Sequence, residues 1–179
     1  MKSNIQVQGI HHITLNGANR QTSIDFWEGI LGMKFIFEQP NLDDLNTNHL
    51  YFDCGDGRTI TVFTKEDRKP KKSKLGNVYG SVHHLAFWVS QSTILIAEKN
   101  LKKNSIPNTG IKNRGFMNSI YFKDPLGLLI ELASYKFDPP FGFSYADVLE
   151  KAHLLRVDRS GTNIEDEDIA LAIRVLKSR

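Results

Sequence analysis

Two histidines and one glutamate are the residues of this 179-residue chain whose types and spacing best suit chemistry. His12 and His84 each stand at the start of an apolar run, and Glu131 is a lone carboxylate within the apolar stretch Leu129–Leu132. A carboxylate buried in such a run is costly unless a cation or a hydrogen-bond donor meets it. Two imidazoles and one carboxylate form a ligand set that leaves positions on a divalent metal open. We therefore predict a metal site made by His12, His84 and Glu131.

These residues occupy matching places in a sequence repeat. The segment Gly9–Leu15, with the sequence GIHHITL, corresponds to Ser81–Phe87, with the sequence SVHHLAF. The pair Tyr51–Phe52 is soon followed by a glycine, and the same pattern recurs 70 residues later at Tyr121–Phe122. Self-similarity at a fixed spacing indicates duplicated structural units.

Each half of the repeat carries the signals of one helix and several strands. Gln21–Leu31 and Thr93–Lys103 place apolar residues at helical spacing. Thr59–Thr64 and Leu128–Ser134 are β-rich runs that follow a glycine. Each half therefore reads as β-α-β-β-β, and the predicted fold class is α+β with two tandem βαβββ modules.

The repeat also predicts the domain organisation. We expect one domain over residues 1–138, followed by a C-terminal extension over residues 139–179. The parts of the domain are module one (about residues 9–66), a linker (67–79) and module two (about 80–138).

The C-terminal extension reads as helical. Ser144–Arg156 and Asn163–Lys177 are the predicted helices, and Asn163 is a suitable N-cap for the second. The apolar stripe of the second helix needs a partner surface, which is either the chain's own domain or a second copy of the chain. The proline-rich turn before these helices, Phe137–Phe143, either covers the site or packs on its outside.

At these residues the chain resembles the vicinal oxygen chelate superfamily, which contains glyoxalase I, bleomycin-resistance proteins and extradiol ring-cleaving dioxygenases. The resemblance covers roughly residues 9–138 and implies two modules that curve into an open metal-binding cup. Carried over position by position, it assigns His12 and His84 to the first strands and Glu131 to a last strand. The fourth symmetric position is Thr61, a neutral hydroxyl where glyoxalase I has a second glutamate. The three ligands that are left resemble the set of non-haem Fe(II) oxygenases.

A second motif implies further site residues. Ile120–Glu131, with the sequence IYFKDPLGLLIE, resembles the C-terminal half of the extradiol signature, in which a tyrosine ten residues before the glutamate binds substrate. Tyr121 holds that position, and strand alternation puts His49 on the corresponding face of the first module. We therefore expect Tyr121 and His49 to contact substrate and move protons. The signature also expects an upstream histidine, but Lys112–Arg114 occupies that region.

Within the superfamily, the chain most resembles bacterial ring-cleaving dioxygenases of the glyoxalase family, some of them linked to hydroquinone resistance. The resemblance implies cleavage of a hydroquinone- or catechol-like ring with O₂, using Fe(II) or Mn(II). Two alternatives stay open. One is a glyoxalase-type isomerase or lyase with a dicarbonyl substrate and Zn(II) or Ni(II), and the other is a bleomycin-resistance-like protein that binds a small molecule. A homodimer is expected, because related folds build the cup either within one chain or across two.

Other conspicuous residues have structural explanations. His11 and His83 alternate away from their neighbours, so we expect them to be structural or to support the metal ligands. Five aromatic residues are expected mainly in the core, although some of these rings could line an apolar pocket: Phe35, Phe37, Phe87, Trp88 and Phe116.

Composition limits the remaining classes. A formal charge of +3, with 40% hydrophobic and 24% charged residues, is ordinary for a globular protein and too weak to predict nucleic-acid binding. Cys54 is the only cysteine, so the chain forms no intrachain disulfide, which suits a reducing compartment. No signal peptide or long apolar run is present in the sequence. We expect a cytoplasmic protein with a small-molecule substrate and with neither a membrane nor a nucleic-acid partner.

Overall fold

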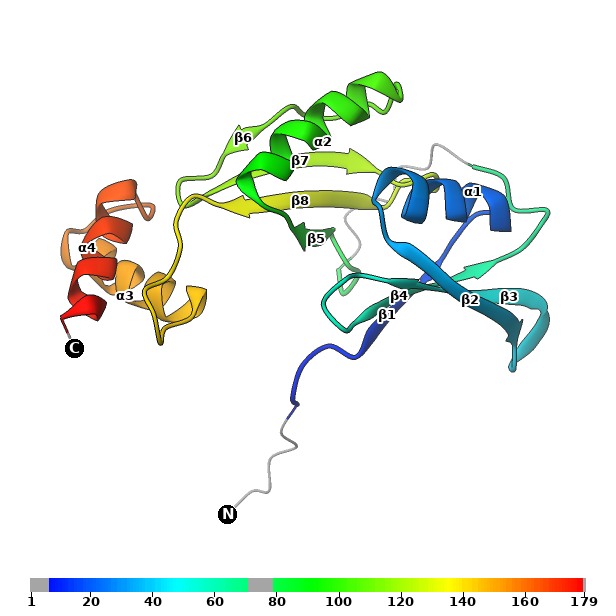
Figure 1. Ribbon diagram of the computed structural model, residues 1–179, viewed down its shortest axis with the longest axis horizontal. Helices are drawn as coiled ribbons and strands as arrows, with labels where there is room; N and C mark the ends of the chain where they lie inside the picture. Colours follow the sequence, from blue (N-terminus) through cyan, green and yellow to red (C-terminus); the bar gives the residue numbers. More distant parts are fainter. Residues whose placement is uncertain (1–6, 71–78, 179) are drawn as a thin grey trace, which may run out of the picture. The chain divides into compact units, whose positions relative to one another are not determined.

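The computed structural model describes residues 7–70 and 79–178, which form two compact units (Figure 1). The first unit runs to Ser81 and includes Lys123–Leu128, and the second comprises Val82–Phe122 and the chain from Leu129 onward. Much of the predicted linker at residues 67–79 lies outside the described residues. No helix in the described ranges is long and apolar enough to cross a membrane.

The first unit contains one four-stranded sheet and a short helical segment. Its elements are β1 (His12–Asn16), α1 (Arg20–Ile24), the π-helical segment η1 (Asp25–Ile30), β2 (Lys34–Asn41), β3 (Asp44–Asp53) and β4 (Thr59–Thr64). The strand order is β1-β4-β3-β2, with β1 parallel to β4 and the other pairs antiparallel. Asn19 caps α1 by accepting the Thr22 N–H at 2.9 Å.

Strand alternation builds the core of this unit. On β3 and β4, the apolar residues of one face are almost fully buried, and the helical segment supplies two buried aromatic rings. These residues are Leu50, Phe52, Ile60, Val62, Phe26 and Trp27.

The second unit repeats this arrangement and adds two helices. Its elements are β5 (Leu85–Trp88), α2 (Gln91–Lys103), β6 (Lys112–Asn113), β7 (Met117–Lys123), β8 (Leu129–Tyr135), α3 (Tyr145–Asp158) and α4 (Asp166–Lys177). The strand order is β5-β8-β7-β6, with β5 parallel to β8 and β6 antiparallel to β7. The predicted α+β class and the βαβββ repeat are therefore confirmed, together with the helical C-terminal portion.

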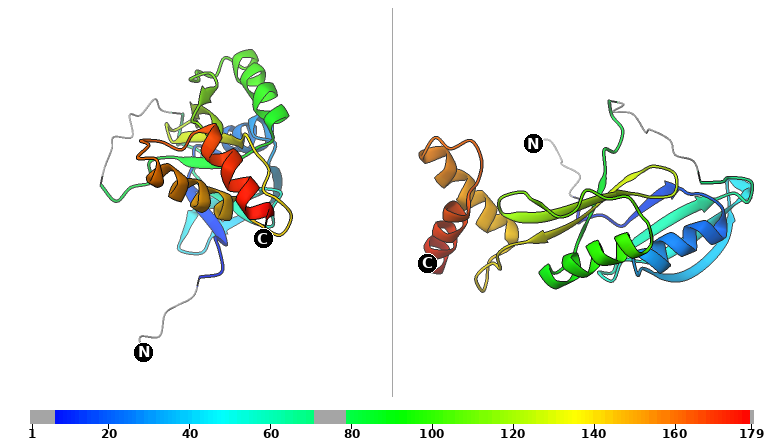
Figure 2. Two further views of the ribbon diagram at one scale, coloured as in Figure 1. Left: turned by 90° about the vertical axis from the view of Figure 1, so that its left-hand side faces the viewer. Right: turned by 90° about the horizontal axis from the view of Figure 1, so that it is seen from above.

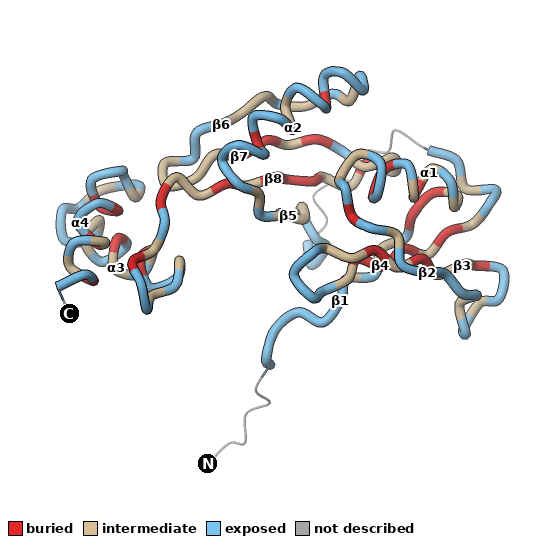
Figure 3. The backbone as a smooth tube through the Cα atoms, viewed as in Figure 1, coloured by how far each residue is buried: buried red, intermediate tan, exposed pale blue. Residues whose placement is uncertain are grey.

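The sheet of the second unit has one apolar face and one face that carries Glu131. Ile130 and Leu132 alternate with Glu131 along β8, so the two apolar side chains point to one face and the carboxylate to the other. Helix α2 lies against this sheet (Figure 1), and two of its apolar residues, Ile94 and Leu101, are buried. Figure 3 shows buried positions along β7 and β8. This packing leaves the Glu131 face available for a site.

The two C-terminal helices pack on each other, as both views of Figure 2 show. Their cluster of buried side chains consists of Phe137, Val148, Ala152, Ile169, Ala172 and Leu176. The apolar stripe of α4 is thus covered by residues of the same chain, from α3 and from Phe137.

Helix α4 begins two residues later than the sequence predicts. Glu165, not Asn163, is the N-cap, and the Glu165 N–H donates to the Asp168 carboxylate at 2.9 Å. The carbonyl of Asn163 instead accepts a hydrogen bond from Arg159, at 2.8 Å. The predicted cap was wrong: the hydrogen bond from Arg159 holds the Asn163 carbonyl in the loop that precedes α4.

Candidate metal centre

Glu131 is the centre of a polar cluster in the second unit. Its side chain is only 5% exposed, yet both carboxylate oxygens have partners. The Tyr121 hydroxyl donates to Oε1 at 2.9 Å, and Nε2 of His84 lies 2.9 Å from Oε2. A buried carboxylate without such partners would carry a large desolvation cost. The cluster therefore holds a carboxylate away from water while satisfying its hydrogen bonds.

The pairing of the strands explains how these residues meet. The register of β5 and β8 places Ala86 beside Glu131, and His84 precedes Ala86 by two residues, on the same side of the chain. Tyr121 reaches the carboxylate from β7, the other neighbour of β8. The guanidinium of Arg114 lies over the Tyr121 ring, 5.3 Å from its centroid. Sequence reasoning missed this last contact, which brings a positive charge to the region where the extradiol signature expects a histidine.

Each predicted ligand histidine is paired with the histidine before it. Nδ1 of His11 lies 2.8 Å from Nδ1 of His12, and the same 2.8 Å contact joins His83 and His84. In each pair one ring donates and the other accepts. Because this contact occupies Nδ1, Nε2 is the atom of His12 and His84 that can bind another group. The two modules thus share a local geometry that strand alternation alone did not predict.

The first unit holds His12 and His49. His12 is exposed at the start of β1, and His49 lies on β3 between the rings of Tyr51 and Phe63, with centroids 4.3 and 4.4 Å away. Nδ1 of His49 lies 3.0 Å from the Tyr51 hydroxyl, whereas its buried Nε2 has no partner among the described residues. Burial lowers the pKa of the His49 imidazole below its ordinary value, and the charge of nearby His12 lowers it further.

Thr61 lies opposite Thr14 in the parallel pair β1 and β4. Its hydroxyl is fully buried and donates to the Thr14 hydroxyl at 2.8 Å. The fourth symmetric position therefore offers a neutral oxygen that already has a hydrogen-bond partner.

The structure brings the five predicted site residues together in two subsets. His84, Tyr121 and Glu131 are in contact within the second unit, while His12 and His49 belong to the first. Within the described residues, no group of three or more His, Cys, Asp or Glu side chains could by itself hold a metal ion. The complete ligand set of His12, His84 and Glu131 stays a prediction.

The donor atoms present suit a divalent transition metal. A carboxylate oxygen and an imidazole Nε2 already converge at Glu131 and His84, and imidazole and carboxylate are the ligands that Fe(II) and Mn(II) accept. Metal-binding imidazoles usually hold an outer partner at their second ring nitrogen, and Nδ1 of His84 has such a partner in His83.

A hollow of about 240 Å³ opens beside Glu131 on the same face of the sheet. Its lining residues are Ala86, Phe87, Trp88, Met117, Glu131, Ala133 and Tyr135. The core prediction for Trp88 and Phe37 is wrong, since these side chains are 68% and 45% exposed. The alternation of β5 contained the missing signal, because it places Trp88 on the face of Ala86 and Glu131.

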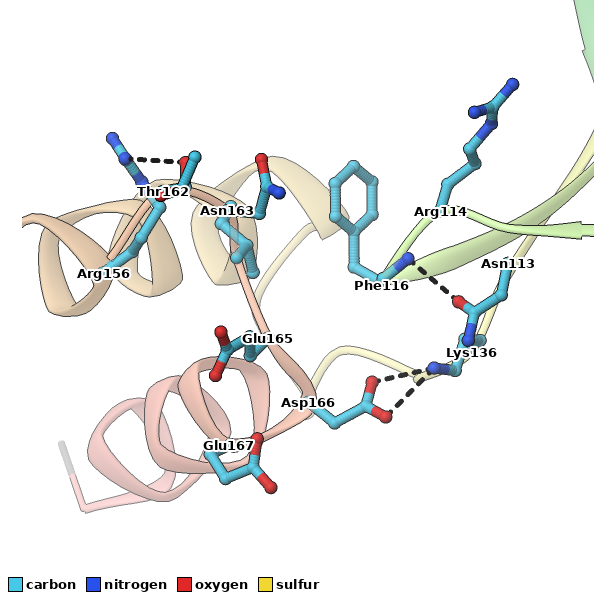
Figure 4. A pocket seen from close by; sticks show the side chains of 12 residues that line it. Asn113, Arg114, Phe116, Lys136, Arg156, Thr162, Asn163, Glu165, Asp166 and Glu167 are labelled. Carbon is cyan, nitrogen blue, oxygen red and sulfur yellow. Dashed lines mark hydrogen bonds and ion pairs between the residues drawn. The ribbon is translucent and has the colours of Figure 1, made fainter.

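A second hollow, of about 890 Å³, lies between the β6–β7 turn and the α3–α4 loop (Figure 4). Lys136 bridges it by donating to both oxygens of Asp166, at 2.8 and 3.0 Å. Gly115 adopts a φ of 84° there, and a Cβ atom at this position would lie 2.9 Å from the Ile164 carbonyl. This region joins the helices to the sheet and contains none of the predicted site residues.

Comparison with known proteins places this geometry in a family. Residues 9–132 match the model of the Glyoxalase/Bleomycin resistance protein/Dioxygenase superfamily. The chain is 32% identical over 128 residues to "Putative ring-cleaving dioxygenase MhqO" of Bacillus subtilis (strain 168), covering 71% of this chain and 40% of that protein. The chain thus spans about two fifths of the length of this relative.

Solved structures give the same result. A crystal structure described as a dioxygenase from Bacillus subtilis superimposes with a TM-score of 0.59 at 30% identity, covering 70% of this chain and 40% of the other. A mutant of the fosfomycin resistance protein FosX from Listeria monocytogenes, crystallised with Mn(II) and 1S,2S-dihydroxypropylphosphonic acid, shares the fold. Its TM-score is 0.53 at 20% identity, covering 71% of this chain and 92% of FosX. Together with the repeated βαβββ units, these matches show that the chain belongs to the glyoxalase/bleomycin resistance protein/dioxygenase superfamily.

Proposed function

We propose that the protein is a metal-dependent dioxygenase that cleaves a hydroquinone- or catechol-like aromatic ring with O₂. In this proposal His12, His84 and Glu131 hold Fe(II) or Mn(II), and His49 and Tyr121 act on substrate. The observation that carries it is the buried contact of Glu131 with His84 and Tyr121, which joins two predicted ligands to the predicted substrate-binding tyrosine. The name of the relative MhqO supports the reaction class.

The bound metal would lower the pKa of a substrate hydroxyl and keep further positions open for O₂. Tyr121 has a defined part in this arrangement. Its hydroxyl donates to Glu131, so a substrate oxygen arriving at that carboxylate comes within reach of the phenol. Arg114 over the Tyr121 ring adds a positive charge that favours an ionised substrate oxygen at the same place.

His49 is suited to accept a proton. Its lowered pKa keeps the imidazole neutral near pH 7. When the Nδ1–H donates to the Tyr51 hydroxyl, the unpartnered Nε2 becomes the basic atom. We therefore assign to His49 the role of general base for the substrate hydroxyl.

The main alternative is a glyoxalase-type isomerase or lyase. The fold is also that of FosX, which is described as a fosfomycin resistance protein and not as a dioxygenase. A glyoxalase-type enzyme needs a carboxylate to shuttle a proton between two carbons. Thr61 disfavours this reaction because its hydroxyl is neutral, buried and bonded to Thr14. A bleomycin-resistance-like binding protein is the third option.

The metal content of protein purified without air and without added metal separates these functions. Near-stoichiometric iron or manganese, followed by O₂ uptake with hydroquinones or catechols, is expected. Zinc or nickel would favour the isomerase, and protein without metal the binding function.

The same measurement tests the ligand assignment. Glu131→Gln keeps the size of the side chain and an acceptor for Tyr121 but removes the charge, so we expect metal affinity to fall by about 100-fold or more. Glu98→Gln is the matched control, because it makes the same change at Glu98 of α2, which forms an ion pair with Lys102 one turn later in that helix. Full metal content and O₂ uptake in Glu131→Gln would refute the proposed site.

The proposal includes a homodimer in a cytoplasmic setting. Cys54 is the only cysteine, so no intrachain disulfide depends on an oxidising compartment. Sedimentation of the purified protein tests the dimer directly.

A further inference from the structure

The hollow beside Glu131 has a floor of small side chains. The register places Ala86 beside Glu131 and Trp88 beside Ala133, so two methyl groups lie on neighbouring strands of one face. The larger side chains of Trp88, Met117 and Tyr135 rise around them. The result is a shallow apolar space with one carboxylate at its edge.

The positions at the floor of the hollow differ in size between the two units. In the first unit, His49 pairs with Phe63 across β3 and β4, and their rings are 4.4 Å apart. The positions 70 residues later are Ser119 and Ala133, which are both small. The first unit therefore places two rings at this part of its sheet, whereas the second has two small side chains there, one of which, Ala133, lines the hollow.

The size and chemistry of the space suit a flat ring. An apolar cavity of about 150 Å³ is known to admit benzene. At about 240 Å³, the hollow accommodates a monocyclic ring with small substituents. Trp88 and Tyr135 present aromatic surfaces and Met117 presents a thioether, which are groups that favour aromatic ligands.

Polar groups stand where ring substituents would lie. Glu131 lines the hollow, and its carboxylate is the acceptor for the Tyr121 hydroxyl. The Ser119 hydroxyl is fully buried and has no hydrogen-bond partner among the residues that the structure describes. By alternation Ser119 shares the face of Met117 and Tyr121, so a ligand hydroxyl is a suitable partner.

The C-terminal extension holds the walls of the hollow in place. Tyr145, the first residue of α3, stacks on Tyr135 with ring centroids 4.2 Å apart and planes 13° apart. Its ring also meets Trp88 edge to face, at 5.9 Å. Ser144 caps the helix by accepting the Asp147 N–H at 3.2 Å, which fixes where α3 begins and therefore where Tyr145 lies. These contacts come from residues beyond the family match at 9–132.

We infer that this hollow binds the aromatic ring of a monocyclic phenol, with Ala133 limiting its size and the C-terminal extension, through Tyr145, orienting Trp88 and Tyr135 against it. The inference deepens the proposed function, on which it rests for the position of the substrate hydroxyls near Glu131. Trp88 and Ala133 are thus specificity-determining residues, and Tyr145 is a positioning residue.

Binding of 4-fluorophenol to the metal-free protein, followed by ¹⁹F NMR, tests the hollow without any reaction. Ala133→Phe fills the floor, and Tyr145→Ala removes the support of both walls. Each is expected to weaken binding by about tenfold or more. Tyr145→Phe keeps the stacked ring and loses only the 3.4 Å contact with Asp138, so it should bind like the unaltered protein. Ala170→Phe, at an exposed position of α4 outside the hollow, is the matched control for Ala133→Phe.

Unchanged 4-fluorophenol affinity in Ala133→Phe, with a native circular dichroism spectrum, would overturn the inference. Equal loss in Tyr145→Phe and Tyr145→Ala would overturn the role of stacking. The proposed function can fail separately. If 4-fluorophenol binds as expected but the metal-loaded protein consumes no O₂ with hydroquinone or catechol, the phenol site in the hollow is supported and the dioxygenase activity is refuted. If O₂ uptake by Ala133→Phe has an unchanged KM for hydroquinone, the dioxygenase activity is supported and the phenol site in the hollow is refuted.

Discussion

His11 and His83 each occupy Nδ1 of the predicted ligand histidine that follows them, at 2.8 Å. A metal-binding imidazole is oriented by the hydrogen bond that its other nitrogen makes. The repeated contact therefore gives both modules the same means of presenting Nε2. The His-His pair, rather than one histidine, recurs in the sequence repeat.

His83→Phe keeps a ring of similar size but removes the partner of His84 Nδ1. We expect metal affinity to fall by about 10- to 100-fold, while the fold is retained because His83 is exposed. Competition with a metal chelator measures this change. His153→Phe, on the exposed side of α3, should leave metal affinity unaltered. Equal affinities in the two variants would show that His83 does not support the site.

At the scale of elements, one ion pair fixes the turn between α3 and α4. Arg159 donates to both oxygens of Asp168, at 2.9 and 2.7 Å, and Asp168 also accepts the Glu165 N–H that begins α4. Asp168 is only 4% exposed. The Arg159 guanidinium, followed by this backbone donor, lowers the pKa of the Asp168 carboxyl from 3.8 to about 2. The charged form is therefore the one that the folded turn favours.

Asp168→Asn should lower the melting temperature at neutral pH by a few degrees, because Arg159 loses its charged partner. The sign of the pH dependence follows from the lowered pKa. The stabilisation by Asp168 is complete above about pH 4 and is lost as the pH falls toward 2. Thermal unfolding of both proteins from pH 6 to pH 2 should show a difference that shrinks only at the acid end.

Asp166→Asn serves as the comparison for this variant, because Asp166 is 67% exposed and its pair with Lys136 lies at the surface. It should change the melting temperature little at any pH. A difference between the unaltered protein and Asp168→Asn that stays constant down to pH 2 would contradict the role assigned to the Arg159 pair.

At the scale of the whole molecule, the predicted ligands are divided between the two units. His12 belongs to one unit, and His84 and Glu131 to the other. Such a division permits two assemblies, in which the ligands come either from one chain or from two chains of a dimer. The chain also covers 40% of the length of MhqO.

Mixing two inactive variants distinguishes these assemblies. We expect His12→Ala and Glu131→Ala each to lose the metal alone. If the sites are shared across a dimer, co-refolding the variants restores one intact site in each mixed dimer, and up to about half the metal binding per mixed dimer returns. If each site lies within one chain, the mixture stays without metal. Elemental analysis of the mixture after removal of free metal gives the result.

The sequence by itself determined the repeated architecture. Strand alternation, helical spacing and the matched GIHHITL and SVHHLAF segments are local signals, and local signals suffice to define βαβββ units. The strand Thr59–Thr64 was predicted with its observed limits, and Leu128–Ser134 was displaced by a single residue. The resemblance to the extradiol signature singled out Tyr121 for a substrate contact, whereas its hydrogen bond to Glu131 came only from the structure.

Only the tertiary structure decided the features that depend on residues distant in the sequence. The exposure of Trp88 and the stacking of Tyr145 on Tyr135 both follow from packing between elements. A hydrophobic ring is equally compatible with a core or with a pocket wall until its neighbours are in place. For Ala133, the empty space above a small side chain is a property of its surroundings, which a one-dimensional pattern does not record.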